Sequence, residues 1–227
     1  MEMNMFLTNQ IVGKVDPDFW RGKKVFITGH TGFKGGWLCL WLSKMGAKIY
    51  GYSLAPITYP NFYGVVGVGA LMEYSYISDI RNLSSLKNAM KEVDADVLIH
   101  LAAQPLVRYS YTNPVETFDT NIMGTVNVLE AARNNKKLKA ILIVTSDKCY
   151  ENHEWDWSYR EIDAIGGADP YSSSKACVEI ISSAYQQSFF SDTVISTARA
   201  GNVIGGGIGP STDLYLMQFP HLKIKKH

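Results

Sequence analysis

Short runs of consecutive apolar residues alternate along the chain with longer stretches whose apolar positions recur every three or four residues. The short runs predict buried strands, and the periodic stretches predict amphipathic helices. Their alternation is typical of an α/β domain with a parallel sheet. We expect strands at 24–28, 48–52, 73–77, 96–101, 140–145 and 194–199, and helices at 33–45, 82–91, 117–133 and 171–188.

This succession of elements predicts a Rossmann-like, doubly wound sheet with the strand order 3-2-1-4-5-6. A second glycine-rich stretch, at Gly64, Gly67 and Gly69, follows no strand and precedes no clear helix, so we expect a loop there. The helix at 117–133 carries one apolar stripe, formed by Phe118, Ile122, Val126 and Leu129.

Composition narrows the class of protein. The 227 residues, 46% apolar and 19% charged, are typical of a globular domain with a sizeable core. A net charge of +1 gives no electrostatic footprint for nucleic acid or an anionic membrane. No run approaches the roughly 18 apolar residues of a membrane span, and the N-terminus lacks the apolar core of a signal peptide. The three cysteines, Cys39, Cys149 and Cys177, favour a reducing cytoplasm and predict no metal site.

Three glycines, Gly29, Gly32 and Gly35, lie between the first predicted strand and the first predicted helix. A sharp turn there needs the permissive backbone of glycine, and a missing side chain lets a pyrophosphate approach the N–H groups at the helix N-terminus. Glycines can also serve tight packing alone. Their place between a strand and a helix favours a site for a nicotinamide dinucleotide, with the Gly-x-x-Gly-x-x-Gly spacing of short-chain dehydrogenase/reductases.

The acid that usually binds the adenosine ribose, about 20 residues beyond the glycines, is missing. No Asp or Glu occurs between Asp18 and Glu73. Ser53 could bind a ribose hydroxyl and Lys34 could bind a 2′-phosphate, so NAD and NADP both stay open. Asp79, after the third strand, could accept a hydrogen bond from the adenine amine or simply cap its own loop.

Tyr171 and Lys175 lie four residues apart on a predicted helix and therefore project from one face. The positive charge of Lys175 should lower the pKa of Tyr171, which could then accept a hydroxyl proton while hydride leaves the same carbon. Such a pair is usually surface decoration when it occurs alone. Combined with the glycine turn, it favours hydride transfer to a nicotinamide.

Asp147 and Lys148 follow a buried strand at its carboxyl end, where doubly wound sheets bind ligands. An ion pair or a solvated turn would explain them without any function. Simple oxidation of an alcohol does not need this second acid and base, so the two residues favour a dehydratase. The neighbouring Cys149 has no evident His partner and is better explained as a small filler.

The chain resembles extended short-chain dehydrogenase/reductases, and among them the CDP-glucose 4,6-dehydratases, over about residues 20 to 207. The glycine turn and the Tyr-x-x-x-Lys pair are common to the superfamily. Lysine after the catalytic aspartate is more specific, because related dTDP-glucose dehydratases have glutamate there. The matching segments are 29–35, 79–81, 100–105, 145–150, 169–175 and 199–207.

The resemblance implies an NAD-dependent lyase of deoxysugar and O-antigen biosynthesis, which converts CDP-D-glucose to CDP-4-keto-6-deoxy-D-glucose and water. Tyr171, assisted by Lys175, would remove the sugar 4-hydroxyl proton while hydride passes from C4 to the nicotinamide. Lys148 would then take the C5 proton, and Asp147 would protonate the departing C6 hydroxyl. Hydride would finally return to C6.

The resemblance also implies binding residues and a homodimer built from the helices at 117–133 and 171–188. Thr145 would bind the sugar 4-hydroxyl, and Arg108 and Asn202 would face the sugar nucleotide. The positions that would line the dinucleotide are Gly29, Thr31, Gly32, Phe33, Lys34, Gly35, Ser53, Asp79, Ile80, Leu101, Ala102, Ala103, Gln104, Thr120, Tyr171 and Lys175.

After Gly207 the resemblance stops, although family members continue for a hundred or more residues that bind the nucleotide half of the substrate. We expect an N-terminal extension (1–21), an NAD(P)-binding domain (22–207) and a divergent tail (208–227). Our hypothesis is a truncated product with impaired activity, because orientation supplies much of catalysis. Two alternatives share the fold: a sugar-nucleotide epimerase or reductase, which needs only the Tyr/Lys pair, and a non-catalytic dinucleotide-binding remnant.

Overall fold

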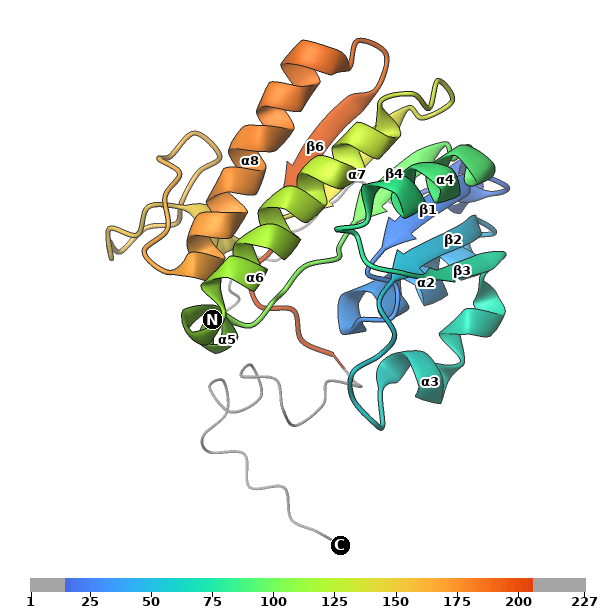
Figure 1. The fold of residues 1–227 in the computed structure, drawn as a ribbon, viewed down its shortest axis with the longest axis horizontal. Helices are drawn as coiled ribbons and strands as arrows, with labels where there is room; N and C mark the ends of the chain where they lie inside the picture. The colour runs from blue at the N-terminus through green and yellow to red at the C-terminus, as the bar shows by residue number, and fades with distance from the viewer. Residues whose placement is uncertain (1–14, 206–227) are drawn as a thin grey trace, which may run out of the picture.

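The computed structural model describes residues 15–205. Its sheet has six parallel strands in the order β3-β2-β1-β4-β5-β6, which confirms the predicted fold class and strand order (Figure 1). The expected tail, 208–227, and the first 14 residues lie outside the described range, so the domain boundaries stay a prediction. The strands are β1 (Lys24–Thr28), β2 (Lys48–Ser53), β3 (Tyr74–Ile77), β4 (Val97–His100), β5 (Ala140–Val144) and β6 (Val194–Ala198).

Helices cover both faces of the sheet, with α4, α7 and α8 together on the face nearest the viewer in Figure 1. Within residues 15–205, no helix combines the length and apolar character needed to span a membrane.

The four longer helices are α2 (Phe33–Lys44), α4 (Leu83–Val93), α7 (Gly124–Ala132) and α8 (Pro170–Phe189). The shorter ones are α1 (Pro17–Trp20), α3 (Phe62–Val66), α5 (Val107–Thr112), α6 (Pro114–Phe118) and the 3-10 turns Val68–Leu71 and Asp147–Cys149.

The sheet separates two hydrophobic cores. Successive residues of a strand point to opposite faces, so β1 sends Phe26 into the core under α4, α7 and α8 and sends Val25 and Ile27 into the core under α2. All three side chains are at most 1% exposed. Burial on both faces explains why the central strands β1 and β4 appear in the sequence as nearly unbroken apolar runs.

The helix predicted at 117–133 differs from the observed one in two ways. It begins earlier, at Pro114, whose fixed φ suits the first helical position. A π-helical turn, Asp119–Met123, also interrupts it between α6 and α7. Such turns occur frequently at functional sites because they redirect side chains out of the regular helical register.

The loop predicted for the second glycine-rich stretch is wrong, because this stretch forms α3 and the 3-10 turn after it. The side chain of Asn61 caps α3 by accepting a hydrogen bond from the N–H of Gly64 at 2.7 Å. Gly67, at φ +68°, ends the helix. Phe62 and Val68 are buried in the core under α2, and this burial outweighs the low helix propensity of glycine.

Gly29 at the end of β1 has φ +79°, and a Cβ added there would lie 2.7 Å from the backbone nitrogen of Ala102. Gly22 has a similar φ of +73° but nothing within 4 Å of an added Cβ. We therefore expect Gly22→Ala to lower the free energy of unfolding by about 1 kcal/mol, through backbone strain alone. Gly29→Ala should cost about 1–3 kcal/mol more, through the added clash. Urea denaturation of both variants measures the difference, and equal losses would contradict the close approach.

Candidate active site

The turn from β1 to α2 forms a close-packed cradle at the carboxyl end of the sheet. Gly29 lies against Ala102, and a Cβ on Gly35 would lie 2.1 Å from the carbonyl oxygen of Gly29. Gly32 precedes α2 and provides no side-chain cap. The N–H groups of the first helical turn are therefore available to an anion, which is the arrangement that suits a pyrophosphate.

Two hydroxyl groups stand near the end of β2, where many dinucleotide folds have an acid. The oxygens of Thr31 and Ser53 are 2.8 Å apart, and the Thr31 hydroxyl donates to the carbonyl of Leu54 at 2.8 Å. Because the single Thr31 proton is used there, Ser53 is the donor of the hydroxyl pair. The Ser53 oxygen keeps its lone pairs and can accept a further hydrogen bond.

Lys34 lies in the first turn of α2. The residue as a whole is exposed. Protein atoms surround its amine, however, and this partial burial lowers the pKa of the amine. Its positive charge also contributes to the lowered pKa of Lys175. A role for Lys34 at a 2′-phosphate stays a prediction.

Asp79 and Arg81 form an ion pair in the loop after β3. The Asp79 carboxylate accepts hydrogen bonds from the backbone N–H of Arg81 at 2.8 Å and from its guanidinium at 2.6 Å. The first of these bonds caps the loop, and the side-chain bond is the main cause of the lowered pKa of Asp79. Ile80 is buried beside Gly124. A role for Asp79 and Ile80 at the adenine stays a prediction.

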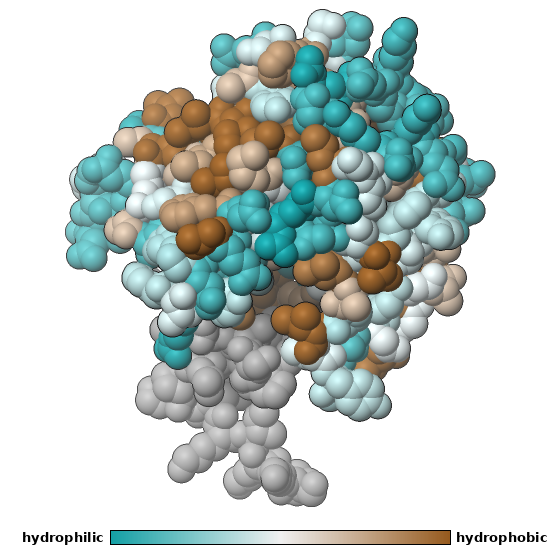
Figure 2. Space-filling view, in the orientation of Figure 1, coloured by the Kyte–Doolittle hydropathy of each residue, from teal (hydrophilic) through white to brown (hydrophobic). Residues whose placement is uncertain are grey.

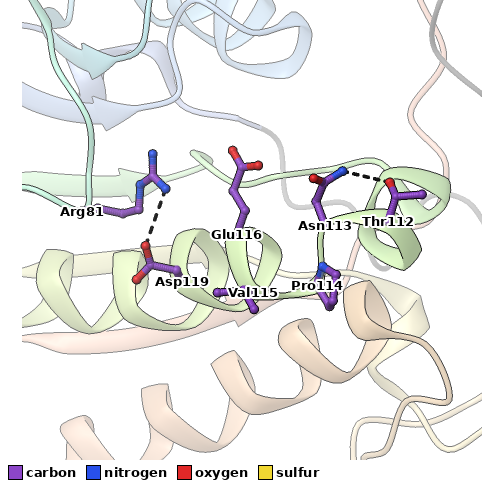
Figure 3. A pocket seen from close by; sticks show the side chains of 7 residues that line it. All are labelled: Arg81, Thr112, Asn113, Pro114, Val115, Glu116 and Asp119. Atoms are coloured by element: carbon purple, nitrogen blue, oxygen red, sulfur yellow. Dashed lines mark hydrogen bonds and ion pairs between the residues drawn. The ribbon is translucent and has the colours of Figure 1, made fainter.

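A hollow of about 440 Å³ lies between this loop and α6 (Figure 3). Arg81 reaches across it to Asp119, with 3.5 Å between the charged atoms, and Glu116 projects into it from α6. Its lining residues are Arg81, Thr112, Asn113, Pro114, Val115, Glu116 and Asp119.

The loop after β4 lines the next part of the cradle. The backbone N–H groups of Leu101 and Ala102 each lie 3.2 Å from the Thr28 hydroxyl, which fixes the loop against β1. Gln104 is held to the π-helical turn by Asn121, and the predicted cofactor residue Thr120 lies on the same turn. The residues predicted to line the dinucleotide in this loop, Leu101, Ala102, Ala103 and Gln104, are all half-buried.

Asn121 is a structural residue of the site that sequence reasoning missed. Its side chain is 2% exposed, accepts a hydrogen bond from the Gln104 N–H at 2.7 Å and donates to the Ser174 hydroxyl at 2.9 Å. It therefore joins the loop after β4 to helix α8. An asparagine at the centre of an apolar helix was the available signal, because a buried amide requires partners.

Tyr171 and Lys175 lie in the first two turns of α8. The Lys175 amine is buried and donates to the Val144 carbonyl at 3.2 Å. Burial, aided by the charge of Lys34 and opposed by Glu179, lowers the pKa of Lys175 to about 8. Burial raises the pKa of Tyr171, and a hydrogen bond with Ser146 opposes the rise. The expected lowering of the Tyr171 pKa by Lys175 is therefore not observed.

Asp147 and Lys148 occupy the 3-10 turn after β5, and both are exposed. The Ser146 hydroxyl donates to a carboxylate oxygen of Asp147 at 3.1 Å, and Ser146 also acts on the pKa of Tyr171. Ser146, for which the sequence predicts no role, therefore lies between the two predicted catalytic pairs. The N–H of Asp147 donates to the carbonyl of Ala200 at 3.1 Å, which anchors the turn to the segment after β6.

The three predicted substrate residues have different surroundings. Thr145 is 2% exposed and its hydroxyl donates to Glu179. Asn202 is exposed, next to Gly201, where an added Cβ would lie 3.4 Å from Asp147. Arg108 is exposed on α5. Asn202 therefore lies near the turn that carries Asp147, whereas the Thr145 hydroxyl is already bonded within the protein.

Metal binding and thiol chemistry find no support in residues 15–205. No group of three His, Cys, Asp or Glu side chains in this range could hold a metal ion. Cys149 is fully buried next to Lys148, and burial raises the pKa of its thiol to about 11. A protonated, buried thiol is a filler rather than a nucleophile.

The parallel sheet, the glycine turn and the Tyr171/Lys175 helix define a Rossmann-like α/β protein of the epimerase and dehydratase type. A family model described as GDP-mannose 4,6 dehydratase matches residues 26–205, and the chain belongs to this family.

Several relatives match the chain. A CDP-glucose 4,6-dehydratase from Salmonella typhimurium is 50% identical over 200 residues, which are 85% of this chain and 55% of the relative. A dTDP-D-glucose 4,6-dehydratase from Dictyostelium discoideum is 30% identical over 81% of this chain and 44% of the relative. The chain thus spans about half the length of these curated relatives.

A solved structure resembles the chain in fold. The UDP-glucose 4-epimerase of Thermus thermophilus, in complex with NAD, has a TM-score of 0.73 and 24% identity over 85% of this chain and 60% of its own.

The lowered pKa of Lys175 makes stability depend on pH. Below pH 8 the amine is charged in both states; between about pH 8 and 10.5 only the unfolded chain keeps the proton, so stability rises with pH. Lys175→Met has no amine at this position and therefore lacks this rise in stability with pH. Its stability relative to the natural chain should fall by on the order of 3 kcal/mol between pH 7 and pH 11, at about 1.4 kcal/mol per pKa unit. Urea denaturation across this range measures it; a constant difference would contradict the lowered pKa.

Proposed function

We propose that the chain contains the cofactor-binding and catalytic part of a CDP-glucose 4,6-dehydratase, a hydro-lyase that acts with NAD. The proposal is supported by 50% identity to a relative of that name over most of the chain. The observation that carries it is the Asp147–Lys148 pair, held in a turn whose Ser146 bonds to Asp147 and acts on the pKa of Tyr171. An epimerase needs the Tyr/Lys pair but has no use for a second acid and base.

Bound NAD would supply a hydride acceptor that later returns the hydride. Tyr171 takes the proton of the sugar 4-hydroxyl as C4 is oxidised. Lys175 provides positive charge beside the reacting groups, because a pKa of about 8 leaves it mostly protonated at neutral pH. Lys148 removes the C5 proton, which the 4-ketone has made acidic, and Asp147 protonates the C6 hydroxyl, so that water departs.

The residues at the glycine turn suit NAD better than NADP. The Ser53 oxygen is free to accept a hydrogen bond, and a 2′-hydroxyl can donate one, whereas a 2′-phosphate presents acceptors only. Roles for the remaining predicted residues, Arg108 and Asn202 among them, belong to the same proposal.

The experiment is incubation of the purified chain with CDP-glucose and NAD, followed by chromatography of the nucleotide sugars. We expect a 4-keto-6-deoxy product. Lys148→Met should reduce water loss by about 10²–10⁴-fold yet still allow NADH absorbance to appear, because C4 oxidation precedes the C5 step. Tyr171→Phe should abolish both signals, and Lys136→Met, at an exposed lysine on another loop, should change neither.

Inversion at C4 without loss of water would support the epimerase alternative and contradict the dehydratase. Binding of NAD without any turnover of CDP-glucose would support the non-catalytic alternative. NADP in place of NAD, in the same assay, tests the cofactor choice.

We also propose a homodimer that pairs α6, α7 and α8 with the same helices of a second copy. Hydrophobic side chains gather over α7 and α8 in Figure 2. Met123 is 48% exposed and Val115 is 80% exposed along the helix pair α6–α7. A contiguous apolar face of this kind is more typical of an interface than of a solvated surface.

Met123→Lys should convert this dimer to a monomer, because the interface would bury an unpaired charge. Ile77→Lys places the same charge at a comparably exposed apolar position on β3 and should leave the dimer intact. Sedimentation velocity of the two variants and the natural chain measures the change. A natural chain that is monomeric at every concentration would contradict the proposed dimer.

We further propose a cytoplasmic location and a role in deoxysugar and O-antigen biosynthesis. The location is supported by three unpaired cysteines, Cys39, Cys149 and Cys177. The biosynthetic role follows from the proposed product, a 4-keto-6-deoxy sugar nucleotide, whose ketone is a starting point for further modification of the ring.

A further inference from the structure

A buried carboxylate bonds to Thr145, two residues before Asp147. Glu179 lies one helical turn after Lys175 on α8, and its side chain is 4% exposed. One carboxylate oxygen accepts the hydrogen bond from the Thr145 hydroxyl. The other accepts from the Thr197 hydroxyl at 2.8 Å and from the Arg199 guanidinium at 2.9 Å.

These bonds join four segments of the chain. Thr145 follows β5 and is the first residue of the segment 145–149, which carries Asp147 and Lys148 and is called the catalytic segment below. Thr197 lies near the end of β6, and Arg199 directly follows this strand. The guanidinium of Arg199 also donates to the carbonyl of Glu161 at 3.0 Å and lies 4.9 Å from the centre of the Tyr150 ring. Glu179 is therefore the point at which β5, β6, α8 and the loop after the catalytic turn meet.

The carboxylate is ionised despite its burial. Burial raises the pKa of Glu179, but the three hydrogen bonds outweigh this effect and hold the pKa below its usual value. Stability alone does not explain such a group, because apolar residues often replace a buried ion pair without loss. One of its contacts is Thr145, the first residue of the catalytic segment, which indicates that Glu179 positions this segment.

We propose that Glu179, held by Arg199, is a positioning residue that fixes Thr145 and thereby places Asp147 and Lys148 against Tyr171. The inference rests on the dehydratase function proposed above. It assigns Thr145 a specific state: because its proton is given to Glu179, its oxygen can only accept a hydrogen bond from a substrate hydroxyl.

The first test compares Glu179→Gln with Thr197→Val. Both change the same buried cluster, but only the first disturbs the bond to Thr145. We expect Glu179→Gln to lower kcat for the 4-keto-6-deoxy product by about 10–100-fold, the scale of a misplacement near 1 Å. KM and the Kd for NAD should change less than about threefold, and Glu179→Asp should recover part of the loss. Thr197→Val should stay within about twofold of the natural chain.

The second test does not depend on turnover. Amide hydrogen exchange should speed up at least about tenfold in residues 145–149 of Glu179→Gln, where the N–H of Asp147 bonds to Ala200. Exchange in the glycine turn, 29–35, should stay unchanged. The natural chain could turn over no CDP-glucose while Glu179→Gln still shows faster exchange. The proposed function would then fail, but the positioning role of Glu179 would stand.

Unchanged exchange in residues 145–149 together with unchanged kcat would overturn the inference. An equal loss of kcat in Thr197→Val would also overturn it, because the cluster would then act only through stability. If Glu179→Gln does not fold, Arg199→Lys takes its place in both tests. This variant keeps a cation beside Glu179 but loses the guanidinium that bonds to both Glu179 and the Glu161 carbonyl. It should show a smaller loss of kcat with the same local rise in exchange, and an absence of both would count against the proposal.

Discussion

The close approach of Gly29 to Ala102 is the constraint on which the rest of the site depends. The two residues follow β1 and β4, the neighbouring central strands from which the chain continues in opposite directions across the sheet. In doubly wound folds, ligands bind outside the carboxyl ends of the strands at this reversal point. Any side chain larger than hydrogen at Gly29 would separate the two loops, and the cradle between α2 and the loop after β4 would change shape.

Buried polar contacts then connect this cradle to the proposed catalytic groups. Asn121 joins the loop after β4 to α8, and the Lys175 amine on α8 bonds to the carbonyl of Val144 at the end of β5. The Ser146 hydroxyl bonds to Asp147 in the following turn. Each contact replaces water around a buried group, so each has a preferred geometry that apolar packing alone would not impose. The hydrophobic cores hold the layers together, and these few polar bonds set the positions of the side chains that we propose to react.

The sequence predicted what depends on local pattern. The six strands and their order follow from apolar runs and from the alternation with helices, and the Tyr171/Lys175 pair follows from helical spacing. The π-helical turn and the helices around Gly67 depend on tertiary packing and were missed. The bond between Thr145 and Glu179 joins residues 34 positions apart, and no local pattern indicates it. The expected lowering of the Tyr171 pKa failed because burial, which a sequence does not reveal, acts in the opposite direction.

Because the hydroxyl pair of Thr31 and Ser53 is uncharged, it would distinguish NAD from NADP differently from a carboxylate. A carboxylate at this position repels a phosphate through charge, and dissolved salt weakens that repulsion. Two hydroxyl groups carry no charge, so the preference rests on hydrogen-bond direction and on the cost of stripping water from the phosphate. Selectivity of this kind is modest in size but nearly independent of ionic strength and pH, and a single basic side chain beside the pair would be enough to reverse it.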